Sequence, residues 1–187
     1  MRIVITGSHG VGKTTLINHF LEILNREEEK FKLLPETPRQ AVKLGFPINE
    51  NTPIETQFWI FAKQIEMEHL AKNYFIADKC FIDLLAYAIF LFPDQPEFLK
   101  VLKDIAKKAA ANYDLVVYLP SGEFPIEDDG VRSTDPRFQS EIDRLVVETL
   151  NDFKINYTKI TGNKEERYKK ALDLMEDIVK IIYTIDN

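Results

Sequence analysis

The chain has 187 residues, 45% of them hydrophobic and 29% charged, a balance typical of one folded domain with a buried core, so we expect a single domain over residues 1–187. One cysteine excludes an internal disulfide framework, and no apolar run is long enough for a signal segment or membrane span, so we expect a cytoplasmic protein without a membrane partner. A formal net charge of −6 argues against nucleic acid as the main partner.

Strand-like and helix-like segments alternate along the chain, which predicts an α/β fold with a parallel sheet covered by helices on both faces. The expected strands are Arg2–Thr6, Lys32–Glu36, Tyr74–Asp78, Asp114–Leu119 and Asn156–Thr161. Apolar residues at helical spacing predict helices over about Lys13–Glu28, Pro53–Asn73, Cys80–Phe92, Pro96–Asn112, Gln139–Phe153 and Glu165–Tyr183.

The segment Gly7–Thr14, GSHGVGKT, matches the pattern G-x-x-x-x-G-K-[ST] at every fixed position and lies between an expected strand and an expected helix. Such a glycine-rich loop lets successive backbone N–H groups point at a polyphosphate. We expect Lys13 to neutralise the outer phosphates and Thr14 to offer its hydroxyl to Mg²⁺. The expected nucleotide-binding residues of this segment are Gly7, Ser8, His9, Gly10, Val11, Gly12, Lys13, Thr14 and Thr15.

Asp78 ends the third expected strand, where phosphoryl-transfer folds place an acidic residue beside magnesium. Lys79 follows it, whereas hydrolytic motor ATPases commonly have a glutamate there that polarises water. The pattern therefore departs from that of a motor. An alternative role for Asp78, compatible with the first, is to cap the helix that begins near Cys80.

Glu36 and Arg39 follow the second expected strand, in LLPETPRQA. The carboxyl ends of parallel strands line the crevice where ligands bind, so both residues are aimed at the same opening as the glycine-rich loop. A carboxylate there can take the proton of an attacking hydroxyl, and an arginine can hold the acceptor. The alternative is that Glu36 caps a helix started by Thr37 and Pro38.

Residues 121–138 combine Gly, Pro and many charges without an apolar period, which predicts a long loop. Arg132 and Arg137 flank Ser133–Pro136 within it. Arginines on a mobile loop can close over a nucleotide and stabilise the charge that develops in phosphoryl transfer. We therefore interpret the segment as a lid. The alternative is a solvated loop whose arginines pair with neighbouring acidic residues.

Two further segments are candidates for ligand contacts. Asn163 lies in ITGNKEERY, one residue type away from the Asn-Lys-x-Asp guanine-reading pattern, which brings a GTPase into consideration. We interpret Gly162–Lys164 instead as a loop that packs on adenine. In the long helix after Pro53, Gln57 is a candidate acceptor contact, and the aromatic residues beside it, Phe58 and Trp59, are either contacts or core.

Taken in order, TGSHGVGKTT, PETPRQA, ADKCFIDLLAYA, YDLVVYLP and EDDGVRSTDPRFQSEIDRLV resemble the P-loop nucleoside and nucleotide kinases. Within them, the chain is similar to small AAA-type ATPases such as the nicotinamide riboside kinase domain of the NAD biosynthesis regulator. The resemblance implies a three-layer fold with a five-stranded parallel sheet in the order 2-3-1-4-5. It also implies ATP as donor, Mg²⁺, and a lid arginine that contacts the phosphates. In such kinases the acid at the position of Asp78 is commonly followed by Arg, so Lys79 departs from the pattern.

We therefore expect an ATP-dependent kinase that phosphorylates a hydroxyl of a nucleoside or a ribosyl-nicotinamide-like acceptor. Alternatives are a regulatory ATPase or GTPase switch, a nucleoside monophosphate kinase and a polynucleotide end kinase. A homodimer through the apolar helices after the third strand is compatible with the sequence. The expected catalytic residues are Lys13, Glu36, Arg132 and Arg137. The expected substrate contacts are Glu36, Arg39, Gln57 and Asp78. The expected magnesium ligands are Thr14 and Asp78, and Asn163 is expected to contact the nucleotide.

Overall fold

The structure of the protein, a computed structural model, describes residues 1–24, 31–128, 130 and 133–185. In these residues, parallel strands form one five-stranded sheet in the order β2-β3-β1-β4-β5. This confirms the sheet and the strand order expected from the sequence. The strands are β1 (Arg2–Thr6), β2 (Lys32–Leu34), β3 (Phe75–Asp78), β4 (Leu115–Tyr118) and β5 (Thr158–Lys159).

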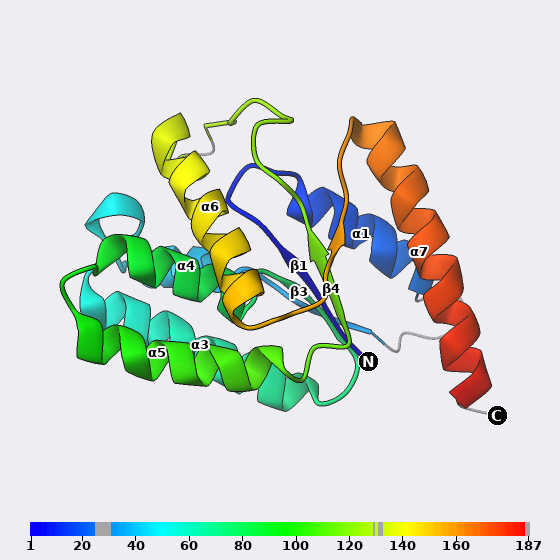
Figure 1. The fold of residues 1–187 in the computed structure, drawn as a ribbon, viewed down its shortest axis with the longest axis horizontal. Helices are drawn as coiled ribbons and strands as arrows, with labels where there is room; N and C mark the ends of the chain where they lie inside the picture. The colour runs from blue at the N-terminus through cyan, green and yellow to red at the C-terminus, as the bar shows by residue number, and fades with distance from the viewer. Residues whose placement is uncertain (25–30, 129, 131–132, 186–187) are drawn as a thin grey trace.

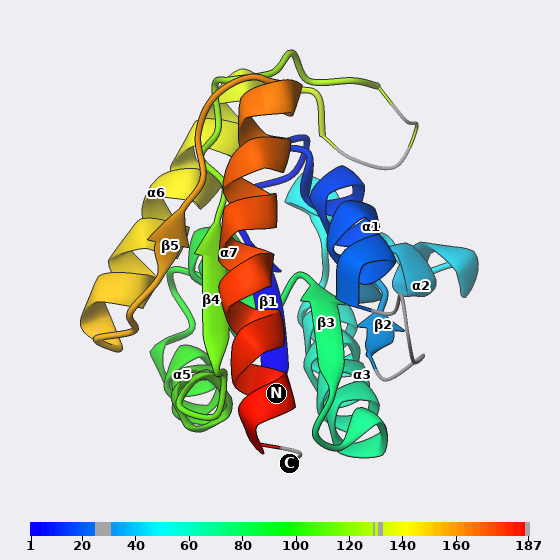
Figure 2. The same cartoon turned by 90° about the vertical axis from the view of Figure 1, so that its right-hand side faces the viewer.

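Helices cover both faces of the sheet, which gives the molecule three layers (Figures 1 and 2). α1 and α7 pack on one face, and α3, α4, α5 and α6 lie on the other. The helices are α1 (Lys13–Leu24), α2 (Thr37–Lys43), α3 (Ile54–Ala71), α4 (Phe81–Leu91), α5 (Pro96–Ala110), α6 (Pro136–Asp152) and α7 (Lys164–Ile185), with a short 3-10 helix, η1 (Asn49–Asn51). None of the described helices is long and apolar enough to cross a membrane.

The central strand, β1, shows why the chain forms this sandwich. Successive side chains of a strand point to opposite faces of the sheet. Ile3 and Ile5 join the core under α1 and α7, while Val4 joins the core under α3 to α6, and all three are fully buried. Because β1 is covered on both sides, it is apolar almost throughout. The loop that follows it emerges at the middle of the carboxyl edge of the sheet.

Several element boundaries differ from the sequence-based predictions. The expected strands Lys32–Glu36 and Asn156–Thr161 are reduced to β2 and β5, both at edges of the sheet. α6 begins at Pro136 rather than Gln139, because Pro136 occupies the first turn and the Asp135 carboxylate accepts a hydrogen bond from the Arg137 N–H. Residues 25–28, the expected end of the first helix, lie outside the described residues.

Candidate active site

The Gly7–Thr14 segment, the P-loop, joins β1 to α1 as predicted. Its first glycine approaches the neighbouring strand end more closely than any side chain would allow. A Cβ atom on Gly7 would lie 2.3 Å from the backbone oxygen of Leu119, which follows β4, and the φ angle of Gly7 is +140°. Glycine is therefore required at this position by space and by backbone conformation.

The side chain of Lys13 is folded against the P-loop. Its Nζ donates hydrogen bonds to the carbonyl oxygens of Gly7 (2.8 Å) and Ser8 (2.5 Å), and the residue is 5% exposed. Burial lowers the pKa of Lys13, although the neighbouring carboxylates of Asp83 and Asp78 oppose this shift. A buried ammonium gains strongly from an anionic partner, which suits Lys13 to bind phosphate oxygens.

Thr14 and Asp78 meet at the same edge of the sheet. The Thr14 hydroxyl donates to Asp78 Oδ2 at 2.5 Å, while Asp78 Oδ1 is buried and has no hydrogen-bond partner among the described residues. Burial raises the pKa of Asp78 despite the attraction of Lys13. A hydroxyl beside a carboxylate with an unused oxygen is the donor set that Mg²⁺ accepts when it keeps several waters. The two residues predicted to hold magnesium therefore fit that ion.

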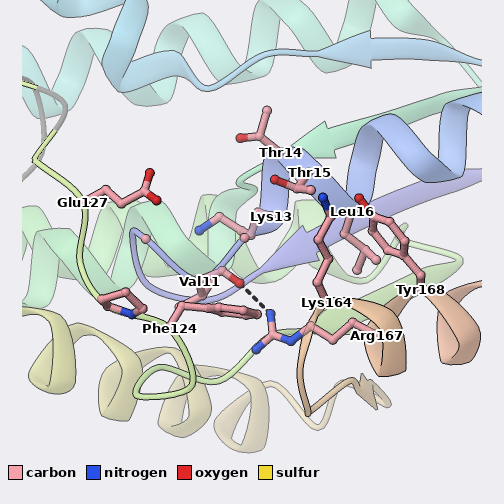
Figure 3. Close-up of a pocket in the computed structure, with 13 residues that line it drawn as sticks. Val11, Lys13, Thr14, Thr15, Leu16, Phe124, Glu127, Lys164, Arg167 and Tyr168 are labelled. Carbon is pink, nitrogen blue, oxygen red and sulfur yellow. Dashed lines mark hydrogen bonds between the residues drawn. The ribbon is translucent and has the colours of Figure 1, made fainter.

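A cavity of about 370 Å³ opens beside the P-loop (Figure 3). Residues of the P-loop, the start of α1, the lid segment and the start of α7 surround it. This volume lies within the range of small-ligand sites. The lining residues are Gly10, Val11, Gly12, Lys13, Thr14, Thr15, Leu16, Phe124, Pro125, Glu127, Lys164, Arg167 and Tyr168.

The cavity contains only part of the expected nucleotide set. Gly10 to Thr15 line it, whereas Gly7, Ser8 and His9 do not. Asn163 is also not among the lining residues. Its side-chain oxygen accepts a hydrogen bond from the Glu166 N–H, and its own N–H donates to the Glu166 carboxylate, so it caps the start of α7.

A second, narrower cavity of about 40 Å³ lies on the other side of the P-loop, with His9 in its wall. It brings together Glu36, Arg39 and Gln57, three of the four residues predicted to contact the acceptor, but not Asp78. Gln57 is 2% exposed and donates to the Leu84 carbonyl at 2.9 Å, which ties α3 to α4. The lining residues are His9, Glu36, Pro38, Arg39, Ile48, Asn49, Thr52, Gln57, Ile60, Lys79, Leu84, Tyr87 and Leu91.

Glu36 is held between two cations in this cavity. Glu36 Oε1 lies 2.8 Å from Lys79 Nζ, and Glu36 Oε2 lies 2.9 Å from Arg39 Nε. Glu36 occupies the residue before α2, yet its side chain makes no capping hydrogen bond, so the structure does not support the capping alternative. Burial lowers the pKa of Lys79, but Glu36 and Tyr87 outweigh it, and the pKa lies above its ordinary value. Lys79 is therefore protonated beside the Glu36 carboxylate.

The backbone around Lys79 is unusual. Lys79 has a φ angle of +76°, a conformation that side-chain residues seldom adopt and that is found at functional sites. Its ammonium lies 4.5 Å from the centre of the Tyr87 ring, and the Tyr87 hydroxyl forms a 3.0 Å hydrogen bond with His9 Nδ1. A chain of contacts through Lys79, Tyr87 and His9 thus joins Glu36 to the P-loop.

Asp78 does not cap α4, because Cys80 and Asp83 form the capping box there.

Three side chains that the sequence analysis did not single out hold the P-loop backbone. Asp83 Oδ1 accepts the Gly7 N–H at 2.8 Å and the Thr6 hydroxyl at 3.0 Å. Gln139 Nε2 donates to the His9 carbonyl at 2.7 Å, and Arg167 Nη1 donates to the Val11 carbonyl at 2.6 Å. They come from α4, α6 and α7, so each of these helices fixes one point of the loop.

Of the two predicted lid arginines, the structure describes one, and it lies away from both cavities. Arg137 is exposed in the first turn of α6 and lines neither cavity. Arg132, the other predicted lid arginine, lies outside the described residues. Ser133 Oγ donates to Glu50 Oε1 at 2.5 Å, so this part of the lid reaches η1, next to the second cavity.

A parallel sheet of this order, with a phosphate-binding loop after its central strand, defines a P-loop nucleotide-binding protein. A family model described as "AAA domain" matches residues 2–167. The chain belongs to this family. It has no significant match among curated proteins.

Several solved structures share the fold. A structure of NadR protein in complex with NR has a TM-score of 0.77 at 18% identity, covering 94% of this chain and 50% of that chain. Another, with NAD and AMP-PNP, has a TM-score of 0.72 at 16% identity, covering 94% and 48%. The chain thus spans about half the length of NadR.

Two shorter kinases align over almost their whole length. Thymidylate kinase from Ehrlichia chaffeensis has a TM-score of 0.63 at 14% identity, covering 97% of this chain and 98% of that chain. Deoxyadenosine kinase from M. mycoides has a TM-score of 0.66 at 14% identity, covering 96% and 99%. These likenesses confirm the expected P-loop kinase fold.

Proposed function

We propose that the protein is an ATP- and magnesium-dependent kinase that transfers the γ-phosphoryl group to a hydroxyl of a nucleoside or ribosyl-nicotinamide-like acceptor. The observation that carries this proposal is the pair of cavities on either side of the P-loop, one for a polyphosphate and one with a buried carboxylate, Glu36. The kinases that share the fold, and the AMP-PNP and NR named with NadR, support it.

In the proposed reaction, Lys13 and the P-loop N–H groups bind the β- and γ-phosphates. Thr14 and Asp78 would hold Mg²⁺, which neutralises phosphate charge when bound. The acceptor oxygen bonds to the γ-phosphorus, the bond from that phosphorus to the bridging oxygen breaks, and the hydroxyl proton passes to Glu36. A carboxylate has about four acceptor positions, so Glu36 can receive the hydroxyl while keeping Lys79 and Arg39.

Arg39 orients the acceptor in this proposal, and the lid arginines Arg132 and Arg137 close on the transferring group. Lid closure also excludes water, which otherwise competes with the acceptor. We propose that the chain works as a single domain, with residues 121–138 as its lid.

The test is to incubate the protein with magnesium, labelled ATP and a panel of nucleosides, nucleoside monophosphates and nicotinamide riboside. We expect one class of acceptor to gain phosphate in step with ADP formation. If ATP or GTP is hydrolysed while no acceptor is labelled, the protein is a nucleotide hydrolase or switch and the proposal fails.

A nucleoside monophosphate is the second candidate acceptor. The acceptor cavity contains two cations, Lys79 and Arg39, against the one carboxylate of Glu36, so a phosphate group on the acceptor would find attractive partners there. The same panel separates the two candidates by which compound is labelled.

A further inference from the structure

The hydrogen bonds of Gln139 and Arg167 fall at two related places in the P-loop. Gln139 binds the carbonyl of His9, the residue before Gly10, and Arg167 binds the carbonyl of Val11, the residue before Gly12. Both side chains are buried, at 5% and 4% exposure. Each bond therefore holds a peptide group that immediately precedes a glycine.

These peptide groups are the ones most free to rotate. Flipping a peptide changes ψ of the first residue and φ of the second, and glycine accepts positive and negative φ alike. Gly10 and Gly12 have φ angles of +73° and +84°. The remaining glycine of the loop, Gly7, has its N–H held by Asp83. Every peptide that precedes a P-loop glycine is thus fixed by a side chain from another element.

Fixing a carbonyl also fixes the direction of the N–H group beside it. In a planar trans peptide the C=O and N–H bonds point in opposite directions. The N–H groups of Gly10 and Gly12 therefore point away from Gln139 and Arg167. Figure 3 shows Arg167 bonded to the Val11 carbonyl on one side of the loop and the side chains of Lys13 and Thr14 on the other side.

The same two side chains are connected to the two ends of the lid. Gln139 lies in α6, whose first residues form the end of the lid segment. Arg167 Nη2 donates to Glu123 Oε2 at 2.7 Å near the start of the lid, and its guanidinium lies 4.6 Å from the centre of the Phe124 ring. A displacement at either end of the lid would therefore act on a P-loop peptide.

From this geometry we infer that Gln139 and Arg167 are positioning residues that direct the Gly10 and Gly12 N–H groups at the polyphosphate and couple them to the lid. The inference rests on the proposed nucleotide site but not on phosphoryl transfer. A variant that loses one of these side chains should bind phosphate groups less well, because an amide that flips away no longer donates.

The test measures binding of inorganic tripolyphosphate, which has no base, and of ADP by titration calorimetry. We expect Gln139→Leu and Arg167→Met each to weaken both ligands about tenfold, the effect of losing one charge-assisted hydrogen bond. Arg167→Lys, which keeps a donor and the charge, should restore part of the affinity. Arg144→Met is the control, because Arg144 is exposed on α6 and pairs only with Glu141 and Glu148 in the described structure.

A second measurement guards against loss of folding. Glycine labelled with a nitrogen isotope gives amide signals for the seven glycines of the chain. In the free protein we expect the Gly10 signal to broaden in Gln139→Leu and the Gly12 signal in Arg167→Met, with Gly7 unchanged. Full tripolyphosphate affinity in both variants would overturn the inference, as would weaker binding of ADP alone. Failure of the proposed function would appear differently, as a wild-type protein that binds nucleotide and transfers nothing.

Discussion

At the scale of single residues, Glu36 is defined by its two cationic partners. Lys79 and Arg39 keep its carboxylate in place and charged, while the buried position limits competition from water. This arrangement favours orientation of an acceptor hydroxyl. The two cations make the carboxylate a weaker base, so its proposed role as proton acceptor applies to the moment of transfer, when the hydroxyl becomes acidic.

Replacing Glu36 by Gln keeps the size of the side chain and removes the proton acceptor. We expect turnover to fall by about 100-fold or more. Affinity for ADP should be unchanged, because Glu36 lines the acceptor cavity and not the nucleotide cavity. Turnover and ADP titration measure the two effects, with Glu148→Gln, an exposed carboxylate on α6, as the control. Full turnover in Glu36→Gln would remove Glu36 from the mechanism.

Gly7 allows a separate prediction about space. In Gly7→Ala, the new Cβ must move away from the Leu119 carbonyl and the residue must also adopt a strained φ. We therefore expect the free energy of unfolding to fall by about 2 kcal/mol or more. Gly45→Ala is a matched control, since Gly45 has a φ of +85° with nothing within 4 Å of the added atom. Its cost should be strain alone, about 1 kcal/mol. Equal losses in urea denaturation would show that the contact with Leu119 has no effect.

At the scale of elements, the position of the start of α6 changes the role that can be expected of Arg137. The residue belongs to a helix capped by Asp135 and not to the open part of the lid, and it is exposed. For Arg137 to reach a nucleotide, the N-terminal turn of α6 would have to move with the lid. Such movements are common in kinases and often accompany substrate binding.

We therefore expect Arg137→Met to lower turnover by at least about tenfold while leaving ADP affinity nearly unchanged, because a lid arginine acts mainly during transfer. Arg144→Met is matched to it, since Arg144 lies about two turns further along the same helix in an exposed ion-pair network. Steady-state kinetics at saturating ATP measures the difference. Equal activity of the two variants would assign Arg137 to the solvated surface of the lid.

The sequence predicted those parts of the site that depend on local pattern. The P-loop and Glu36 each follow a strand, and Asp78 ends one. Strand ends meet at one edge of a parallel sheet, so the proximity of these residues follows from topology. Asp83, Gln139 and Arg167 have no such signal. They bind backbone atoms up to 156 residues away, and a buried polar residue resembles an exposed one in the sequence.

Dependence on residues distant in the sequence also explains why some predicted element boundaries were wrong. β2 and β5 are edge strands with a neighbour on one side only, so pairing stops sooner than their apolar pattern suggests. α2 begins at Thr37 with Pro38 in its first turn, where the sequence offered a helix start, whereas η1 lies in a stretch for which no element was assigned. Asn163 shows that a residue in a plausible binding motif can act as a helix cap.

At the scale of the whole molecule, Glu68 links the stability of the fold to pH. Glu68 is a partly buried residue of α3, and its carboxylate accepts hydrogen bonds from the Tyr113 hydroxyl, just before β4, and from Gln64, both at 2.9 Å. Burial raises the pKa of Glu68, and these hydrogen bonds only partly oppose the shift.

A carboxyl whose pKa is higher in the folded than in the unfolded state favours the fold while it is protonated. Its contribution is full below the unfolded pKa and is lost as the pH rises through the folded pKa. We therefore expect Glu68→Gln to gain stability relative to wild type between about pH 4 and pH 7, by about 1.4 kcal/mol for each unit by which the pKa is raised. Urea denaturation at both pH values measures this gain. Glu66→Gln, which changes an exposed residue paired with Lys63, is the control and should show no such gain. If the difference in stability between Glu68→Gln and wild type is the same at both pH values, the expectation is wrong.

The unequal size of the two cavities affects how fast each ligand can bind. The nucleotide cavity is open at about 370 Å³, whereas the acceptor cavity, at about 40 Å³, has no room for a nucleoside until its walls separate. Nucleotide can then arrive at a rate set by diffusion, while acceptor arrival waits for an opening step and levels off as acceptor concentration rises. In an enzyme built this way, throughput would depend on how often the second cavity opens.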